Sequence, residues 1–240
     1  MLTFLRKIRL SLIESGSARK YLLYAIGEIA LVVIGILIAL QINKSNEWRK
    51  EREIERVVLE DIKDNIIRNN LLIESALQII DQINQSTKIV KVVINTKTPY
   101  SDTLGIHFSQ SIRHGGFLLR MNSDGYESLK NIGFGIIQNE QLKDEILSLF
   151  EVSYSNYEIE LQWGNSVYSG GYGWWKDYFY VIEEDLFIPI HYDNILNDRR
   201  LLSELNELAD VRESIQNEIE ECHKHNQLVL QLIEEELGEE

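Results

Sequence analysis

The sequence has very little cysteine and proline for its 240 residues. Its single cysteine, Cys222, excludes an intramolecular disulfide, so thiols say nothing about the compartment of the protein. The two prolines, Pro99 and Pro189, leave long stretches free to be helical, because proline removes a backbone donor and blocks a helix interior. These two scarcities favour a helical protein without internal covalent cross-links.

Basic residues are scarce after residue 56. Residues 1–56 hold ten Lys and Arg against six Asp and Glu, whereas residues 57–240 hold fourteen against thirty-two. An acidic body repels phosphate backbones, so we expect no nucleic-acid partner. The basic N-terminal end suits an anionic lipid surface, and we expect the lipid bilayer as a partner.

Catalytic motifs are missing as well. The sequence has no G-x-S-x-G, H-E-x-x-H or Walker-like element, and a triad assembled only by folding leaves no spacing to find. Glu221, Cys222 and His225 are metal-ligand types on shared helix faces, but zinc requires about four ligands. We interpret them as a cysteine on an apolar stripe beside surface histidines. We therefore predict no enzyme activity, no metal and no cofactor.

The most prominent feature that is present is an apolar run from Tyr21 to Ile42, whose only ionisable group besides tyrosine is Glu28. About 22 residues of helix extend roughly 33 Å, which is enough to cross a hydrocarbon core of about 30 Å. The run is too long for the core of a cleaved signal peptide. We predict a basic interfacial segment over 1–18 and an uncleaved transmembrane helix over 19–44.

Glu28 lies on the same line of this helix as Gly35 and Ala39, at about 100° per residue. Small residues let two helices approach closely, and a polar group in such a contact can hydrogen-bond across it. One hypothesis is a self-associating span with these three residues in its interface, as in a homodimer or a complex with another membrane protein. The other is an acid tolerated in a monomeric span, reaching toward headgroup water.

Basic residues flank the span on both sides, so charge alone does not orient it. A short basic tail is usually retained in the cytoplasm, while a long downstream domain can be translocated regardless of its charge. We therefore expect the N-terminus in the cytoplasm and residues 45–240 in the periplasm of a bacterial cell.

Two blocks of the sequence resemble an uncharacterised family of bacterial single-pass membrane proteins. The first block is KYLLYAIGEIALVVIGILIALQINKSNEWRK, and the weaker second block is YESLKNIGFGIIQNEQLKDEILSLF, from Tyr126 to Phe150. The first departs slightly from the family pattern, since Trp48 follows the Asn and Glu. The resemblance implies envelope membrane localisation and a helical body, and it implies no activity.

The body reads as an elongated antiparallel helical bundle over 45–240. Its first helix, predicted over 46–95, carries an apolar line with a 3-4 spacing that widens into a broad stripe. Asn69 interrupts that line, either to fix the register or as a satisfied polar group in the core. The remaining predicted elements are short helices within 100–137, a helix over 139–163, an aromatic segment over 164–192 and a C-terminal helix over 198–237.

The aromatic segment is the clearest candidate for a ligand surface in the body. Ten of the 22 aromatic residues of the chain lie between Trp163 and Tyr192. Stacked aromatic rings can bind sugars, glycan strands or a partner helix, although core packing explains the same composition. The residues that would form this surface are Tyr172, Trp174, Trp175 and Tyr178.

Together these observations predict an all-α, single-pass membrane protein. Its expected function is that of a non-enzymatic interaction or sensor-like module of the bacterial envelope. The alternative is an extracytoplasmic ligand-binding domain that uses the aromatic stretch 163–192.

Overall fold

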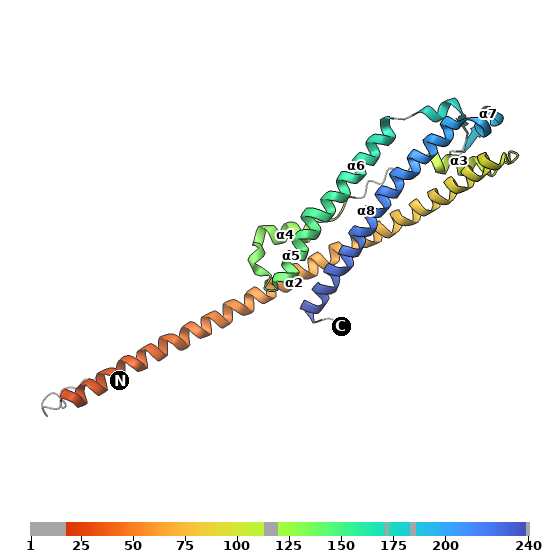
Figure 1. Ribbon diagram of the computed structural model, residues 1–240. Helices are drawn as coiled ribbons and strands as arrows, with labels where there is room; N and C mark the ends of the chain where they lie inside the picture. The colour runs from red at the N-terminus through yellow and green to blue at the C-terminus, as the bar shows by residue number, and fades with distance from the viewer. Residues whose placement is uncertain (1–17, 113–119, 171–172, 183–185, 239–240) are drawn as a thin grey trace. The chain divides into compact units, whose positions relative to one another are not determined.

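The computed structural model describes residues 18–112, 120–170, 173–182 and 186–238. The described chain is mostly helical, which confirms the predicted class (Figure 1). Its α-helices are α2 (Ala18–Thr96), α3 (Leu104–Ile112), α4 (Asp124–Ile132), α5 (Glu140–Ser148), α6 (Tyr154–Gly170), α7 (Tyr192–Asn197) and α8 (Arg199–Leu237). The predicted interfacial segment 1–18 lies almost wholly outside the described residues.

The chain divides into two compact units, Met1–Glu55 and Arg56–Glu240. The first unit contains the N-terminal part of α2. By length and composition, α2 is the one helix among the described residues that could cross a membrane. The large apolar side chains between Leu22 and Ile42 are all exposed, at 47–72% of their surface. The predicted transmembrane segment is therefore a helix with apolar side chains on its whole circumference.

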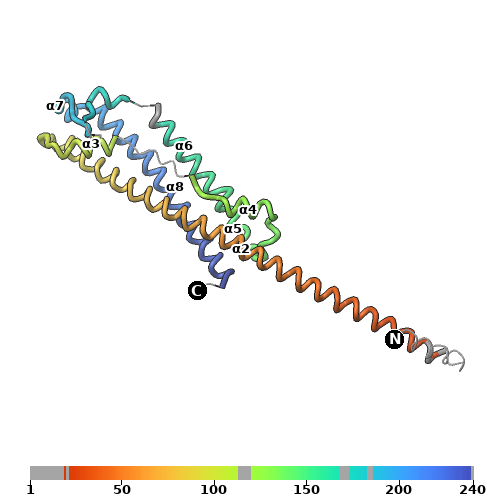
Figure 2. The backbone as a smooth tube through the Cα atoms, turned by 180° about the vertical axis from the view of Figure 1, so that it is seen from behind, coloured from red at the N-terminus to blue at the C-terminus, as the bar shows by residue number. Residues whose placement is uncertain are grey.

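The second unit is built around the C-terminal part of α2 and helix α8, which lie side by side (Figure 2). Their polar contacts show that the two segments run in opposite directions, because the partners descend along α8 as they ascend along α2. The joining pairs are Lys63–Glu234, Asn70–Asn226, Asn84–Gln216 and Thr87–Arg212. Helices α5 and α6 pack against the same two segments and complete the larger of two hydrophobic cores.

Side chains from α4 close this larger core at one end. Gly125, in the first turn of α4, lies so near to α2 that a Cβ atom there would be 2.7 Å from the backbone nitrogen of Ile62. Only glycine permits that approach. The backbone N–H of Gly125 donates to Asn65 Oδ1 at 2.7 Å, and Asn65 is buried on α2. A close backbone contact and a buried amide therefore hold α4 in place.

A smaller core lies at the other end of the second unit. It joins α3, α7, the last turns of α2 and the first turns of α8 to a two-stranded antiparallel sheet. The strands, β1 (Phe179–Val181) and β2 (Phe187–Pro189), lie within the predicted aromatic segment. These strands were not predicted, because two runs of three residues give too short a pattern to recognise.

One predicted helix end is wrong. The helix expected to stop at Gly164 continues to Gly170. Gly164 instead lies buried inside α6, where a Cβ atom would be 2.5 Å from Ile215 Cδ1 on α8. The glycine allows two helices to approach closely, so it marks a contact and not an end.

Candidate functional site

An irregular stretch of backbone in the second unit is a wide turn between α5 and α6. Residues Leu149–Ser153 form a π-helix, η2, which is called the π-turn below. Such a turn adds one residue to an α-helix and is frequent at functional sites. Leu149 and Phe150 are buried in the larger core, whereas Ser153 is half-buried. The turn therefore brings polar side chains to the surface beside α8.

Ser153 forms one end of a three-residue hydrogen-bonded chain. Its Oγ lies 2.7 Å from Nδ1 of His225, and Nε2 of His225 lies 3.0 Å from Oε2 of Glu145. When the imidazole is neutral, its Nε2–H donates to the Glu145 carboxylate, which only accepts, and Nδ1 then accepts the Ser153 O–H. The π-turn, α8 and α5 each contribute one residue of this serine–histidine–glutamate chain.

Ser153 and His225 of the serine–histidine–glutamate chain border a surface hollow of about 470 Å³. Ser153, Asn156, Lys224, His225 and Leu228 are among its lining residues, together with Glu218, Glu221 and Cys222. Burial, and then the nearby Glu218, raise the pKa of the Cys222 thiol to about 12. The thiol is therefore protonated near neutral pH and is not a reactive nucleophile.

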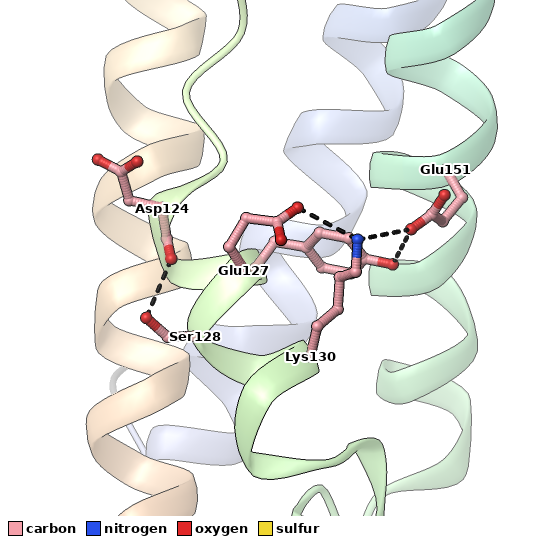
Figure 3. A network of polar contacts seen from close by, with 6 residues as sticks. Asp124, Glu127, Ser128, Lys130 and Glu151 are labelled. Atoms are coloured by element: carbon pink, nitrogen blue, oxygen red, sulfur yellow. Dashed lines mark hydrogen bonds and ion pairs between the residues drawn. The ribbon is translucent and has the colours of Figure 1, made fainter.

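The opposite side of the π-turn contacts α4. Tyr126 stacks on Phe150 with 4.5 Å between ring centroids, and its hydroxyl donates to Glu151 at 2.6 Å. Figure 3 shows Lys130 between Glu127 and Glu151, with Nζ–O distances of 3.2 and 3.9 Å. Burial, followed by the hydrogen bond to Glu151, raises the pKa of Tyr126. The π-turn is thus fixed on both sides by charged or polar contacts.

A second polar chain crosses the larger core. Asn69, which is fully buried, accepts from the backbone N–H of Asn122 and donates to the Tyr154 hydroxyl at 3.0 Å. Tyr154 donates to Asn226, whose amide donates to Asn70, each at 2.8 Å. This chain confirms that Asn69 is a satisfied polar group of the core. Because every member bonds to a different segment, the chain also fixes how these segments align.

Arg212 is buried between the two cores. Its exposed surface is 0%, and its guanidinium donates to Thr87 Oγ1 at 2.9 Å, to the Ser111 carbonyl at 3.2 Å and to Asn84 Oδ1 at 3.4 Å. Burial and the nearby Arg212 lower the pKa of Lys91. Arg212 therefore joins α8 to α2 and to the end of α3.

The predicted aromatic surface lies over the smaller core. Trp174 and Trp175 are half-buried, and Trp174 packs against both cores. The ring of Trp175 lies 4.5 Å from that of Phe187, while the Tyr178 hydroxyl donates to Asp198 at 2.7 Å. Tyr172 is outside the described residues. Packing thus explains the three described rings, and their role as a ligand surface stays a prediction.

The three predicted association residues, Glu28, Gly35 and Ala39, lie in the first unit, on α2. Gly35 and Ala39 are exposed, and a Cβ atom added at Gly35 would meet nothing within 4 Å. Within the described residues, no group of three or more His, Cys, Asp or Glu side chains is placed to hold a metal ion.

Sequence reasoning missed the pairing of Ser153 and Glu145. In a regular α-helix, residues eight apart point about 80° away from each other. The extra residue of the π-turn removes about 100° of rotation, so both side chains lie on the side of the helix where each contacts His225. His225 is 72 residues away from Ser153, and its position depends on how α8 packs. A serine and a glutamate eight residues apart were therefore not a recognisable signal.

The chain matches no protein-family model, no curated protein and no solved structure. The resemblance to an uncharacterised membrane-protein family thus stays a prediction, and the function must be argued from the geometry of this chain.

Proposed function

We propose that this protein is a single-pass membrane protein of the bacterial envelope whose second unit is a helical interaction or sensor-like module. The observation that carries the proposal is the exposed apolar surface of α2. Fourteen large apolar side chains between Leu22 and Ile42 are at least 47% exposed. Soluble proteins rarely leave such a continuous apolar surface in water, whereas a bilayer covers it fully.

The second unit supports a role in contact with other molecules. We propose an elongated antiparallel bundle for residues 45–240. It is supported by the two cores, the internal polar chain and the buried Arg212. A domain held together in this way offers long helical faces to a partner. We place it in the periplasm, with the short basic tail in the cytoplasm.

Alkaline extraction tests the anchor. Membranes from cells that express the full chain are washed with salt and then with carbonate, and the protein should stay in the pellet. A variant with Ile34→Lys and Ile38→Lys should appear in the soluble fraction, because each central lysine costs about 2.5–3.5 kcal/mol on insertion scales. The matched control, with Ile54→Lys and Val57→Lys outside the span, should stay in the pellet. Release of the unaltered chain by salt would refute the anchor.

Reporter fusions at the C-terminus test the orientation. An enzyme that is active only outside the cytoplasm should be active on this chain, and one that is active only inside should not. The reverse result would make the second unit a cytoplasmic module on the inner leaflet.

Cross-linking in membranes tests association through the span. Gly35→Leu and Ala39→Leu should reduce cross-linked dimer, because both add bulk to the line that contains Glu28. Ala30→Leu is the control, since Ala30 lies on the opposite side of the same helix at about 200° from Glu28. Equal dimer in all variants would show that this face does not form the contact.

A further inference from the structure

The serine–histidine–glutamate chain has a direction that suits nucleophilic chemistry. The Glu145 carboxylate holds the proton of His225 on Nε2, at 3.0 Å. Nδ1 therefore presents its lone pair to the Ser153 hydroxyl, at 2.7 Å. This is the arrangement in which a base removes the proton of a serine while a carboxylate fixes the tautomer of that base.

We propose that Ser153 is an acyl-accepting nucleophile, with His225 as its general base and Glu145 as a residue that positions His225. The substrate class is a carboxylic ester with a short acyl group. This inference does not depend on the membrane anchor or on the orientation of the second unit.

The surroundings of Ser153 match this role. Ser153 is half-buried and lines the hollow, so a small molecule can reach its Oγ. A helical serine commonly bonds back to a carbonyl one turn earlier, but this one bonds to the imidazole across to α8. The π-turn makes that possible, since its extra residue rotates Ser153 toward His225.

The hollow also contains groups that suit an ester. Asn156 and Lys224 line it and carry N–H donors of the kind that a developing oxyanion requires, and the Lys224 ammonium donates to Glu221 at 2.6 Å. Leu228 supplies an apolar wall and is 43% exposed, which suits a short acyl chain. The two carboxylates, Glu218 and Glu221, disfavour an anionic substrate and favour a neutral ester.

The acylation step balances without a cofactor. The Ser153 proton passes to Nδ1 as Oγ attacks the carbonyl carbon, and a new Oγ–C bond forms. The C–O bond to the alcohol then breaks, and His225 gives its proton to the departing oxygen. Water can reverse the sequence, because Nδ1 removes its proton and returns one to Oγ when the acyl group leaves as a carboxylic acid.

A fluorophosphonate probe tests the nucleophile directly. The full chain in detergent is treated with the probe, the labelled peptide is found by mass spectrometry, and heat-denatured chain gives the background. Label should appear on Ser153 as Oγ displaces fluoride, and Ser153→Ala should abolish it. His225→Gln should slow labelling at least about 100-fold, as is typical when a general base is lost. Ser155→Ala, two residues away and exposed, should label like the unaltered chain.

The role of Glu145 needs a readout that a purely structural contact would not change. Labelling rate is measured against pH for Glu145→Gln and Glu145→Asp, after circular dichroism has shown equal helix content. Glu145→Gln should slow labelling about 10-fold or more at each pH, and Glu145→Asp should restore part of the rate. Equal rates for all three chains would remove Glu145 from the proposal.

A second measurement uses p-nitrophenyl acetate. One equivalent of nitrophenol released in a burst would show an acyl acceptor that keeps its acyl group, and continued release would show turnover. Either result supports the proposal if it disappears with Ser153→Ala. The proposal would be overturned if labelling and nitrophenol release were no faster than with denatured chain, or if His225→Gln left both unchanged. The three residues would then be a structural link between helices.

Discussion

The two parts of helix α2 have the same backbone and opposite surfaces. Between Leu22 and Ile42 the apolar side chains surround the helix and are exposed. From Leu59 to Ile94 the apolar side chains of the predicted line lie on one side and are buried, first in the larger core with α5, α6 and α8 and then in the smaller core with α3 and α8. The period of the apolar side chains therefore separates the two parts, because a helix that is apolar all round must be covered on every side, whereas a striped helix is covered on one.

The polar residues of the two parts differ in the same way. The buried side of the second part includes Asn65, Asn69 and Thr87, and each is hydrogen-bonded within the protein. Thr87 interrupts the apolar line and accepts from Arg212. In the first part, Glu28 is the one acidic residue between Leu22 and Ile42. A polar group buried in the protein core is thus matched by fixed partners.

Truncation of one isoleucine in each part should give the largest contrast. Ile66→Ala, at a fully buried site, should lower the free energy of unfolding by about 2–5 kcal/mol, because it leaves a cavity. Ile34→Ala, at a site 52% exposed in the span, should leave that quantity almost unchanged. Denaturant unfolding of the full chain in detergent, followed by circular dichroism, measures both. Equal losses would mean that the span and the second unit unfold as one.

Removal of one asparagine from each unit should give a smaller contrast. Asn69→Ala should cost about 1–3 kcal/mol, because it leaves the backbone N–H of Asn122 and the Tyr154 hydroxyl short of a partner. Asn46→Ala is the control on the same helix, since Asn46 bonds only the neighbouring exposed Arg49 among the contacts described. The same unfolding measurement applies. A cost at Asn46 as large as that at Asn69 would contradict the importance of burial.

The long helices could be predicted from sequence because their signal is local and repeated. Every apolar position of the predicted line on α2 is buried in the structure, and so is a line of apolar residues with helical spacing on α8, from Leu201 to Ile233. The gap in the α8 line is filled by Asn226, which is also buried and belongs to the polar chain. The start of α5 was predicted as well, and the Asn139 side chain accepts from the Leu142 N–H. Periodicity and capping act within a few residues, so one sequence shows them.

The candidate site could not be predicted because it depends on packing. The π-turn changes the rotation of the helix by one residue, and no residue type in Leu149–Ser153 predicts a π-helix. His225 meets Ser153 only when α8 lies against α5 and α6. The two short strands also depend on packing, since Phe179 and Phe187 pack in the smaller core and bring the strands together. Contacts between distant segments need the fold itself.

The smallest effect concerns Cys222 and becomes visible only at alkaline pH. Burial raises its pKa to about 12, so the folded chain keeps a proton that the unfolded chain loses near its ordinary pKa of 9.0. The stabilising contribution is fully present below pH 9 and is lost as the pH rises toward 12. Cys222→Val keeps a similar volume and should change stability little at pH 7. Between pH 9 and 10 the unaltered chain should lose stability more steeply than the variant, because the unfolded tyrosines that begin to ionise there act alike on both chains.

Denaturant midpoints at several pH values measure this difference. The tyrosines complicate the range above pH 10, because burial and a bond to Asp198 raise the pKa of Tyr178 to about 12, and burial also raises those of Tyr154 and Tyr157. Both chains should therefore lose stability there, and the unaltered chain should lose it more steeply until the pH approaches the raised pKa of Cys222. If Cys222→Val loses stability as steeply as the unaltered chain between pH 9 and 10, the Cys222 thiol is exposed to water in solution. The packing of α8 around the thiol would then be looser than the packing around the buried part of α2.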